Sequence, residues 1–357
     1  MLSLEESAID TQQRQASHYT SLAKTVRESG LLRRRYAYYW SRIVLAVLAF
    51  GAVWAGVFVL GNSWFQLLLA GALGVIVTQF GFLGHDGAHR QIFVSAAWNE
   101  WMSRVLAGAF AGLSYGWWRS KHNRHHAAPN QEGKDPDIAP GALAFTREIA
   151  DSRQTGFAGW FVRRQGWLFF PLLTLEGLNL HAASVRTLLR PDAVKHQRVE
   201  AALVLSRLAV YIVVLLLVLP FGKAAAFFAL QMAVFGVCLG GSFAPNHKGM
   251  PIVPATARID FLRRQVLMSR NVRGGPFVDF AMGGLNYQIE HHLFPSMPRP
   301  NLRHVQPVVR RYCADHGIAY TEVSLLRSYR IVIDYLNNVG LRARGPFDCP
   351  TAQEMRG

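Results

Sequence analysis

The sequence predicts an all-α integral membrane protein with four transmembrane helices, arranged as two hairpins, and a cytosolic cap that carries a histidine-rich site. Two observations lead to this fold. The apolar residues are collected into four long blocks, which form two pairs separated by mixed sequence. Seven of the 13 histidines fall into three short clusters that lie between or after these blocks. Such alternation is expected to gather the histidines at one face of the membrane.

The four spans are expected at about residues 43–60, 64–83, 203–219 and 224–243. A helix rises about 1.5 Å per residue, so runs of roughly 20 apolar residues match a hydrocarbon core of about 30 Å. The two turns inside the pairs carry one lysine, Lys223, whereas the other segments carry nearly all of the positive charge. The positive-inside rule therefore puts the histidine clusters and both termini on the cytoplasmic side.

This pattern divides the chain into three regions. Residues 1–40 are expected to form a cytosolic tail and an interfacial helix, because arginines stand beside aromatic residues near its end. Residues 41–320 form the membrane domain. Residues 321–357 form a cytosolic C-terminal tail.

The sequence between the two pairs of spans is harder to assign. Residues 98–118 are moderately apolar but contain Glu100 and Arg104. A full crossing here would separate the first two histidine clusters, so we expect an interfacial or re-entrant helix pair. Residues 156–180 combine aromatic side chains with two arginines, which is typical of an amphipathic helix on the membrane surface.

The composition limits the classes of function. The net charge of +16 suggests nucleic acid, but the basic residues flank apolar spans and no basic stripe with stacking aromatics lies outside them. We therefore expect anionic lipid, and no nucleic acid, as the partner of this charge. Three widely spaced cysteines without a CxxC motif argue against a disulfide scaffold or a thiolate metal site. The first 40 residues lack the early apolar core of a signal peptide, so the first span is expected to remain as an anchor.

The histidine clusters have the spacing of metal ligands. His122, His125 and His126 stand at i, i+3 and i+4, so their rings project from one helix face. His85 and His89 are four residues apart, which is the ligand spacing of a metal-binding helix. The simpler interpretation of any one cluster is a solvated or structural turn, but three clusters together predict a shared metal site. Imidazole ligands alone leave iron, zinc and copper open.

The order HDxxH, HxxHH and QxxHH, interleaved with apolar segments, resembles the membrane fatty acid desaturase family. Residues 122–138 read HNRHHAAPNQEGKDPDI and residues 286–295 read NYQIEHHLFP, which is typical of its acyl-lipid or linoleoyl-CoA-like, front-end branch. The resemblance extends over roughly residues 40–320. It implies a di-iron centre in the histidine-rich site, with molecular oxygen as the co-substrate.

The resemblance also implies a set of site residues. In the family, a histidine after the fourth span is a ligand, and Gln288 occupies a position where many members have a histidine. The expected metal ligands are His85, His89, His122, His125, His126, His247, His291 and His292. Candidates for orienting these rings or shaping the pocket are Asp86, Asn246, Asp135, Asp137, Asp279, Gln288 and Glu290.

The activity implied by this resemblance is the oxygen-dependent introduction of a double bond into a long-chain fatty acyl group carried by CoA or lipid. Two alternatives remain open: a fatty-acyl hydroxylase of the same superfamily, and a zinc-dependent membrane hydrolase or receptor. The N-terminal segment lacks a His-Pro-Gly-Gly haem motif, so a separate electron donor is expected, either a ferredoxin or a cytochrome with a flavin reductase. Basic side chains for a CoA, a phospholipid or this donor are Arg299, Arg303, Arg310 and Arg311.

Overall fold

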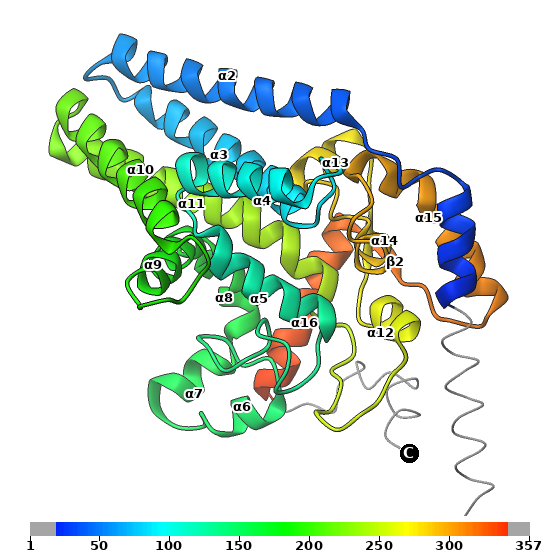
Figure 1. Ribbon diagram of the computed structural model, residues 1–357. Helices are drawn as coiled ribbons and strands as arrows, with labels where there is room; N and C mark the ends of the chain where they lie inside the picture. Colours follow the sequence, from blue (N-terminus) through cyan, green and yellow to red (C-terminus); the bar gives the residue numbers. More distant parts are fainter. Residues whose placement is uncertain (1–18, 342–357) are drawn as a thin grey trace, which may run out of the picture.

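The computed structural model describes residues 19–341, and expectations for the two ends of the chain beyond these residues lie outside it. Its fold is mostly helical (Figure 1). Among residues 19–341, four helices are each long and apolar enough to cross a membrane: α2 (Tyr36–Leu60), α3 (Gln66–Ala88), α10 (Gln197–Val218) and α11 (Phe221–His247). The four predicted spans are therefore confirmed as candidate membrane helices. The helices extend beyond the apolar runs at the ends that lead to the histidines.

Helices α3 and α11 form the centre of the bundle, with α2 and α10 on its outside (Figure 1). The most apolar windows of α2 and α10 are only 17% buried, against 50% for α3 and 39% for α11. Gly74 allows the close approach of α3 to α11, because a Cβ there would lie 2.8 Å from Val234. The outer helices thus present most of their apolar surface to the surroundings, as lipid-facing helices do.

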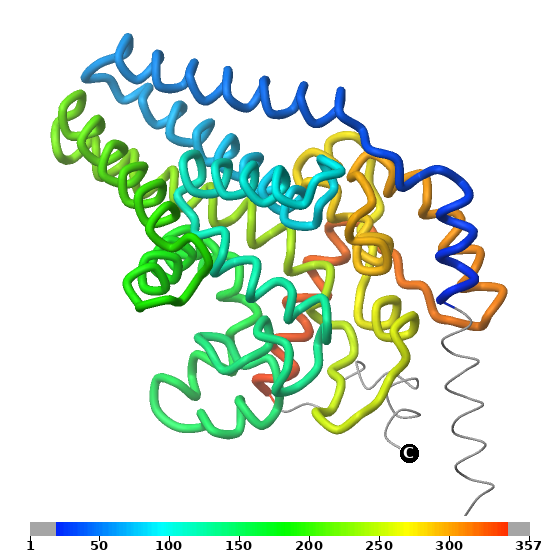
Figure 2. The backbone as a smooth tube through the Cα atoms, viewed as in Figure 1, coloured from blue at the N-terminus to red at the C-terminus, as the bar shows by residue number. Residues whose placement is uncertain are grey.

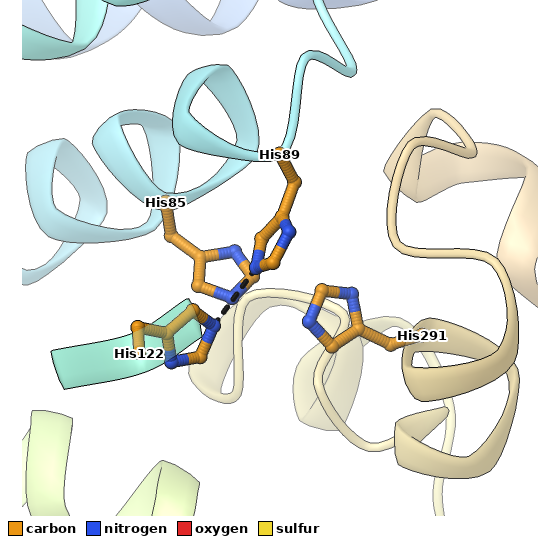
Figure 3. A group of neighbouring side chains, drawn as sticks. All are labelled: His85, His89, His122 and His291. Carbon is orange, nitrogen blue, oxygen red and sulfur yellow. Dashed lines mark hydrogen bonds between the residues drawn. The ribbon is translucent and has the colours of Figure 1, made fainter. Parts of the chain in front are cut away.

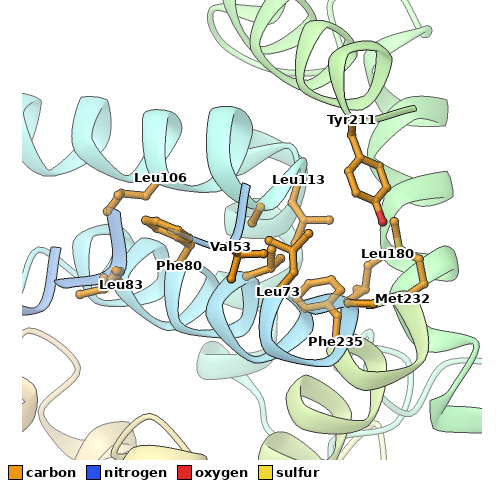
Figure 4. Packing of buried hydrophobic residues seen from close by; sticks show 14 of the residues in the cluster. Val53, Leu73, Phe80, Leu83, Leu106, Leu113, Leu180, Tyr211, Met232 and Phe235 are labelled. Atoms are coloured by element: carbon orange, nitrogen blue, oxygen red, sulfur yellow. The ribbon is translucent and has the colours of Figure 1, made fainter. Parts of the chain in front are cut away.

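Large apolar side chains fill the space between these helices (Figure 4). Leu73 and Phe80 of α3 and Phe235 of α11 are fully buried in this cluster. A buried polar pair within the bundle satisfies its own hydrogen bond, as a membrane interior favours. The Tyr211 hydroxyl donates to Gln231 Oε1 at 3.1 Å and joins α10 to α11.

The short connections α2–α3 and α10–α11 lie at the same end of the bundle. Lys223, in the first turn of α11, donates to the side chain of Asn62 at 2.7 Å and to its carbonyl at 3.1 Å. Gln66 donates to the Val57 and Gly61 carbonyls, and so closes the first connection. His85 lies at the end of α3, and His247 at the end of α11, that is farthest from these two connections.

The segment between the two pairs of long helices is folded into shorter helices. Residues 96–127 form α4 (Ala96–Val105), the π-helix η1 (Leu106–Ala111) and α5 (Tyr115–Ala127), with a break at Gly112, whose φ is 75°. The expected helix pair is thus present, and its position relative to the membrane stays a prediction.

The prediction of a single amphipathic helix at residues 156–180 is wrong. After α6 (Arg147–Asp151), the chain forms α7 (Gly156–Val162), α8 (Gln165–Leu173) and α9 (Glu176–Leu188). Helices α8 and α9 are bent by 70° at their junction, and they are long and apolar enough to cross a membrane only when taken together. Pro171 inside α8 lacks a backbone N–H, and this favours an end to the helix nearby.

The remaining elements form a cap around the histidine-bearing end of the bundle. These elements are α12 (Phe261–Leu267), β1 (Asn271–Arg273), α13 (Pro276–Ala281), α14 (Gln288–Leu293), α15 (Arg299–Asp315), β2 (Glu322–Ser324) and α16 (Leu325–Leu341). Strands β1 and β2 pair in parallel, with Val272 opposite Val323. The fold therefore differs from the all-α prediction by this small sheet. The helical residues 19–28 pack beside α15 (Figure 2). Leu22 and Val26 belong to the apolar cluster that also contains buried residues of α15.

The segment predicted to be the C-terminal tail is packed into the molecule as far as it is described. Helix α16 lies against α8 and α11, with Val332 and Leu336 fully buried. The Tyr329 hydroxyl donates to the Gly241 carbonyl of α11 at 3.0 Å. An amphipathic pattern in residues 325–341 is the sequence feature that indicates this packing.

Candidate metal centre

Four helix ends bring the eight candidate histidines to one place. The last turn of α3 carries His85, and His89 caps its C-terminus. Helix α5 carries His122, His125 and His126 on one face, as their spacing predicts. The C-terminus of α11 provides His247, and α14 provides His291 and His292. The structure therefore gathers all eight imidazoles, and their role as metal ligands remains a proposal.

The first group of ring nitrogens comes from three helices (Figure 3). His85, His89, His122 and His291 each direct one nitrogen to a common point, with these atoms within 4.8 Å of one another. His122 Nε2 lies 2.8 Å from His89 Nε2. The buried Nε2 atom of His85 has no hydrogen-bond partner among the described residues.

The second group consists of His125, His247 and His292. In each ring, Nδ1 faces an acceptor: Asp135 at 3.0 Å, the Met268 carbonyl at 2.9 Å and Gln265 Oε1 at 2.9 Å, respectively. These contacts fix the proton on Nδ1, so each Nε2 carries a lone pair. The Nε2 atoms of His125 and His247 are only 3.2 Å apart, and that of His292 has no partner among the described residues.

His126 connects the two groups. Its Nε2 atom lies 3.0 Å from His122 Nε2 and 3.2 Å from His291 Nε2. Its ring also stacks on His292 of the second group, with the centroids 4.1 Å apart. The two groups are thus neighbours, as in a binuclear centre.

Metal ions fit this donor set. Burial holds the pKa of His122, His126, His291 and His292 well below the usual value and lowers that of His89 to about 3. These rings are therefore neutral at pH 7. In the second group the Nδ1 atoms hold the protons, so the Nε2 lone pairs of His125 and His247 meet at 3.2 Å with no proton of their own between them. A cation between the nitrogens removes this conflict, and two clusters of nitrogens suit two first-row transition metals.

Three carboxylates from the predicted set surround the centre. Asp135 accepts from His125 Nδ1 with both oxygens, at 3.0 and 3.1 Å. Burial is the largest influence and raises its pKa, but the hydrogen bond and electrostatic interaction with His125, together with Lys248, leave the pKa below its usual value. Asp137 lies 3.4 Å from the same nitrogen and forms an ion pair with Lys121 at 2.8 Å. Asp86 lies 3.4 Å from His85 Nδ1.

The other predicted residues have different positions. Asn246 donates to Gln288 Oε1 at 3.1 Å, and the Gln288 amide lies 2.9 Å from His247 Nε2, so this pair adjoins the second group. Glu290 accepts from Tyr320 and Asn271, each at 2.7 Å, and these bonds hold α14 to β1 and to the segment before β2. Asp279 accepts from Asn286 at 2.8 Å. None of the hydrogen bonds described for Glu290 or Asp279 goes to a histidine.

Sequence reasoning missed several residues around the centre. Gln265 and the Met268 carbonyl orient His292 and His247, but they are 27 and 21 residues away in sequence. Trp118 stacks on His122 with the ring centroids 4.3 Å apart. Its position four residues before His122 on a helix is a signal that predicts this contact.

Helix α5 is held in place from its N-terminus. The buried Glu200 of α10 accepts from Ser114 Oγ at 2.7 Å, from the Gly116 amide at 3.0 Å and from Arg104 Nε at 3.2 Å. One carboxylate thus binds α4, the start of α5 and α10 together. A negative charge at a helix N-terminus is also favourable to the helix dipole.

The fold and the site together define a mostly helical protein with candidate membrane helices and a buried histidine-rich site compatible with metal binding. Comparison with known proteins identifies the family. Residues 62–324 match the family model described as "Fatty acid desaturase". This chain therefore belongs to the fatty acid desaturase family.

Characterised relatives are similar over most of the chain. The "Acyl-lipid (9-3)-desaturase" of Physcomitrium patens is 30% identical over 87% of this chain and 60% of its own length. The "Delta(5) fatty acid desaturase fat-4" of Caenorhabditis elegans is 30% identical over 90% and 73%. The "Delta(6)-fatty-acid desaturase fat-3" of the same organism is 26% identical over 93% and 77%. The chain thus spans less than two thirds of the moss enzyme.

Proposed function

We propose that this protein is an oxygen-dependent di-iron desaturase that introduces a double bond into a long-chain fatty acyl group. The observation that carries the proposal is that the Nε2 atoms of His125, His247 and His292 lie close together. In each of these rings an acceptor at Nδ1 keeps the lone pair on Nε2. Relatives named as acyl-lipid and Delta(5), Delta(6) or Delta(8) desaturases support the same reaction.

The proposed ligands are His85, His89, His122 and His291 for one ion and His125, His247 and His292 for the other, with His126 between them. When bound, iron would supply the oxidising power for removing two hydrogens from neighbouring methylenes, with molecular oxygen reduced to water by these and by two electrons from the separate donor. The chain's own residues hold the rings as neutral donors: Asp135, Gln265 and the Met268 carbonyl keep a proton on each Nδ1. Burial of the cluster excludes water from the reacting carbons.

The proposed topology has two hairpins with the metal centre and the cap on the cytoplasmic side. The bond from Lys223 to Asn62 supports this arrangement, because it joins the two connections at one end of the bundle. From that end, α3 rises about 30 Å to His85, which is about the thickness of a hydrocarbon core. A cytoplasmic centre is accessible to a separate electron donor, a ferredoxin or a cytochrome with a flavin reductase.

Expression in a host of known lipid content tests the proposed reaction. We expect new unsaturated acyl chains by mass spectrometry of the total lipids, dependent on oxygen and absent from a His125→Ala/His292→Ala variant. His316→Ala serves as the control, because this histidine lies at the end of α15, outside the cluster. The purified protein should contain about two irons per chain.

Other outcomes identify the alternatives. A hydroxylated acyl product without a new double bond would replace the desaturase with a hydroxylase. Stoichiometric zinc, together with no oxygen-dependent turnover after iron loading, would favour a hydrolase or a receptor.

A further inference from the structure

Two neighbouring residues at the start of β1 lie between the helices that carry His247 and His292. Arg270 directly precedes β1, and Asn271 is its first residue. Their side chains are almost completely buried, with 1% and 0% exposure. The hydrogen bonds of Arg270 go to the end of α11, and those of Asn271 go to α14. This pair therefore connects two of the helices that form the metal centre.

Arg270 holds the C-terminus of α11. Its backbone N–H donates to the Asn246 carbonyl at 2.8 Å. Its Nη2 atom donates to the Lys248 carbonyl at 2.9 Å and also to the Pro245 carbonyl. Carbonyls in the last turn of a helix lack partners within the helix, so one residue satisfies three of these groups around His247.

The guanidinium of Arg270 is a buried charge whose partners are carbonyl groups. No carboxylate among residues 19–341 pairs with it, and burial alone lowers its pKa to about 10, so it is charged at pH 7. A positive charge at a helix C-terminus is favourable to the helix dipole. The last turn of α11, rather than an acidic side chain, therefore stabilises this cation.

The same short segment also orients the ring of His247. The Met268 carbonyl, two residues before Arg270, accepts from His247 Nδ1 at 2.9 Å. The backbone at His247 and the direction of its ring are thus both fixed from residues 268–270. A metal ligand has to be held within about 0.5 Å of its working position, so such support matters for binding.

Asn271 holds α14 in a corresponding way. Its Oδ1 atom accepts from the Ile289 backbone N–H at 2.9 Å, and its Nδ2 atom donates to Glu290 Oε2 at 2.7 Å. Both partners lie in the first turn of α14, directly before His291 and His292. The side chain of Asn271 thus fixes the start of the helix that provides these two histidines.

We propose that Arg270 and Asn271 are positioning residues of the metal centre, Arg270 for His247 and Asn271 for the histidines of α14. The ring centroids of His247 and His292 lie 4.8 Å apart although the rings come from different helices. Strand β1 contacts both helices, so it is the element that sets this separation. The inference rests on the metal centre proposed above.

Cobalt titration of the metal-free full chain in detergent tests these roles without turnover. Co²⁺ alone is the probe, because its visible absorption reports the ligands around each ion. We expect two ions per unchanged chain, and His247→Ala identifies the absorption of the second ion. Arg270→Met should bind this ion about tenfold more weakly, as is usual when the support of a ligand is removed, and should bind the first ion unchanged.

Two further variants make the expectation specific. Asn271→Leu should weaken both ions, because α14 provides His291 to the first group and His292 to the second. Arg270→Lys keeps the charge, but its compact ammonium cannot reproduce the planar fork, so the second ion should bind about threefold more weakly. This milder variant also decides the role of Arg270 if Arg270→Met does not fold.

The matched control removes a half-buried arginine at a distance from the centre. Arg207 of α10 donates to the Phe110 carbonyl at 3.2 Å, and none of the contacts described for it reaches one of the eight histidines. Arg207→Met should lower the melting temperature and still bind both ions. Weakening of the second ion in this control, or equal weakening of both ions in Arg270→Met, would overturn the positioning role in favour of a general loss of folding.

The titration separates this inference from the proposed function. Two ions bound with unchanged affinity and absorption in all the variants of Arg270 and Asn271 would sink the positioning roles alone. An unchanged chain that binds no cobalt would sink the metal centre itself.

Discussion

At the scale of single residues, the centre depends on which nitrogen of each imidazole carries its proton. Asp135, Gln265 and the Met268 carbonyl each accept from an Nδ1, so the lone pair of each of these rings is on Nε2. Asp135 is the only charged group of the three. The backbone N–H of Asn130 donates to its Oδ2 at 2.7 Å. A charged acceptor raises the basicity of the ligand as well as fixing its orientation.

Replacing Asp135 with Asn should therefore weaken the second metal position. An amide in this place can present its NH₂ group to Nδ1 and favour the wrong tautomer of His125. We expect iron content to fall toward one per chain and activity to fall about 10- to 100-fold, as is usual when such partners are removed. Elemental analysis and lipid profiles measure both. Asp315→Asn, on the exposed end of α15, is the control, and full iron content in Asp135→Asn would contradict this role.

Burial of the histidines also predicts a pH dependence for the metal-free protein. The pKa values of His122, His126, His291 and His292 are well below the ordinary value of about 6.5 in the folded chain. Above that pH the rings are neutral in both states. Below it, the unfolded chain binds protons that the folded chain does not, so stability falls as the pH falls.

Thermal melts of the apoprotein between pH 8 and pH 5 measure this effect. We expect the melting temperature to decrease below about pH 6.5. A His122→Asn/His126→Asn variant has fewer buried imidazoles and should show a smaller decrease. An equal decrease in both proteins would assign the pH dependence to groups outside the cluster.

At the scale of elements, the contact of α3 with α11 fixes the relative positions of His85 and His247. Gly74 lies at this contact, where a Cβ would be 2.8 Å from Val234 and 2.9 Å from the Gln231 carbonyl. Gly71 lies one turn earlier on the same helix, with no atom within 4 Å of a Cβ added to it. The two glycines are thus a matched pair for the effect of packing.

Alanine should act in opposite directions at these two glycines. Overpacking at Gly74 costs about 1–3 kcal/mol, which exceeds the gain of about 0.5–1 kcal/mol from replacing a glycine inside a helix. Gly71→Ala should keep that gain and melt at a slightly higher temperature than the unchanged protein. Thermal melts in one detergent compare the two variants, and equal melting temperatures would show that α3 and α11 do not pack at Gly74.

The same elements explain how far the sequence allows prediction. Apolar run length predicts the four long helices, and the spacing of His122, His125 and His126 predicts their common face, because both are local properties. The acceptors Gln265 and Met268 were not predictable, since tertiary packing alone brings α12 to the histidines. The division of residues 156–188 into three helices is not evident from the amphipathic pattern, because the bend between α8 and α9 depends on tertiary packing as well as on Pro171.

At the scale of the whole molecule, the distribution of charge and the bundle geometry agree. The two short connections meet at one end through Lys223 and Asn62. The histidines and the carboxylates around them lie at the other end. A membrane placed around the four long helices thus separates a nearly uncharged end from a basic end, which is the asymmetry expected between the outer and cytoplasmic faces.

Cysteine accessibility tests this orientation. In a background with Cys238, Cys313 and Cys349 replaced by Ala, one cysteine is introduced at Gly222 in the first turn of α11, where added atoms meet open space. A second variant carries it at the exposed Thr256 in the cap. Because the proposed topology has α11 cross the bilayer between these ends, a membrane-impermeant maleimide should label only Gly222→Cys in intact spheroplasts. Thr256→Cys should react after the membrane is opened, and labelling of Thr256→Cys in intact spheroplasts would place the metal centre outside the cell, away from cytoplasmic electron donors.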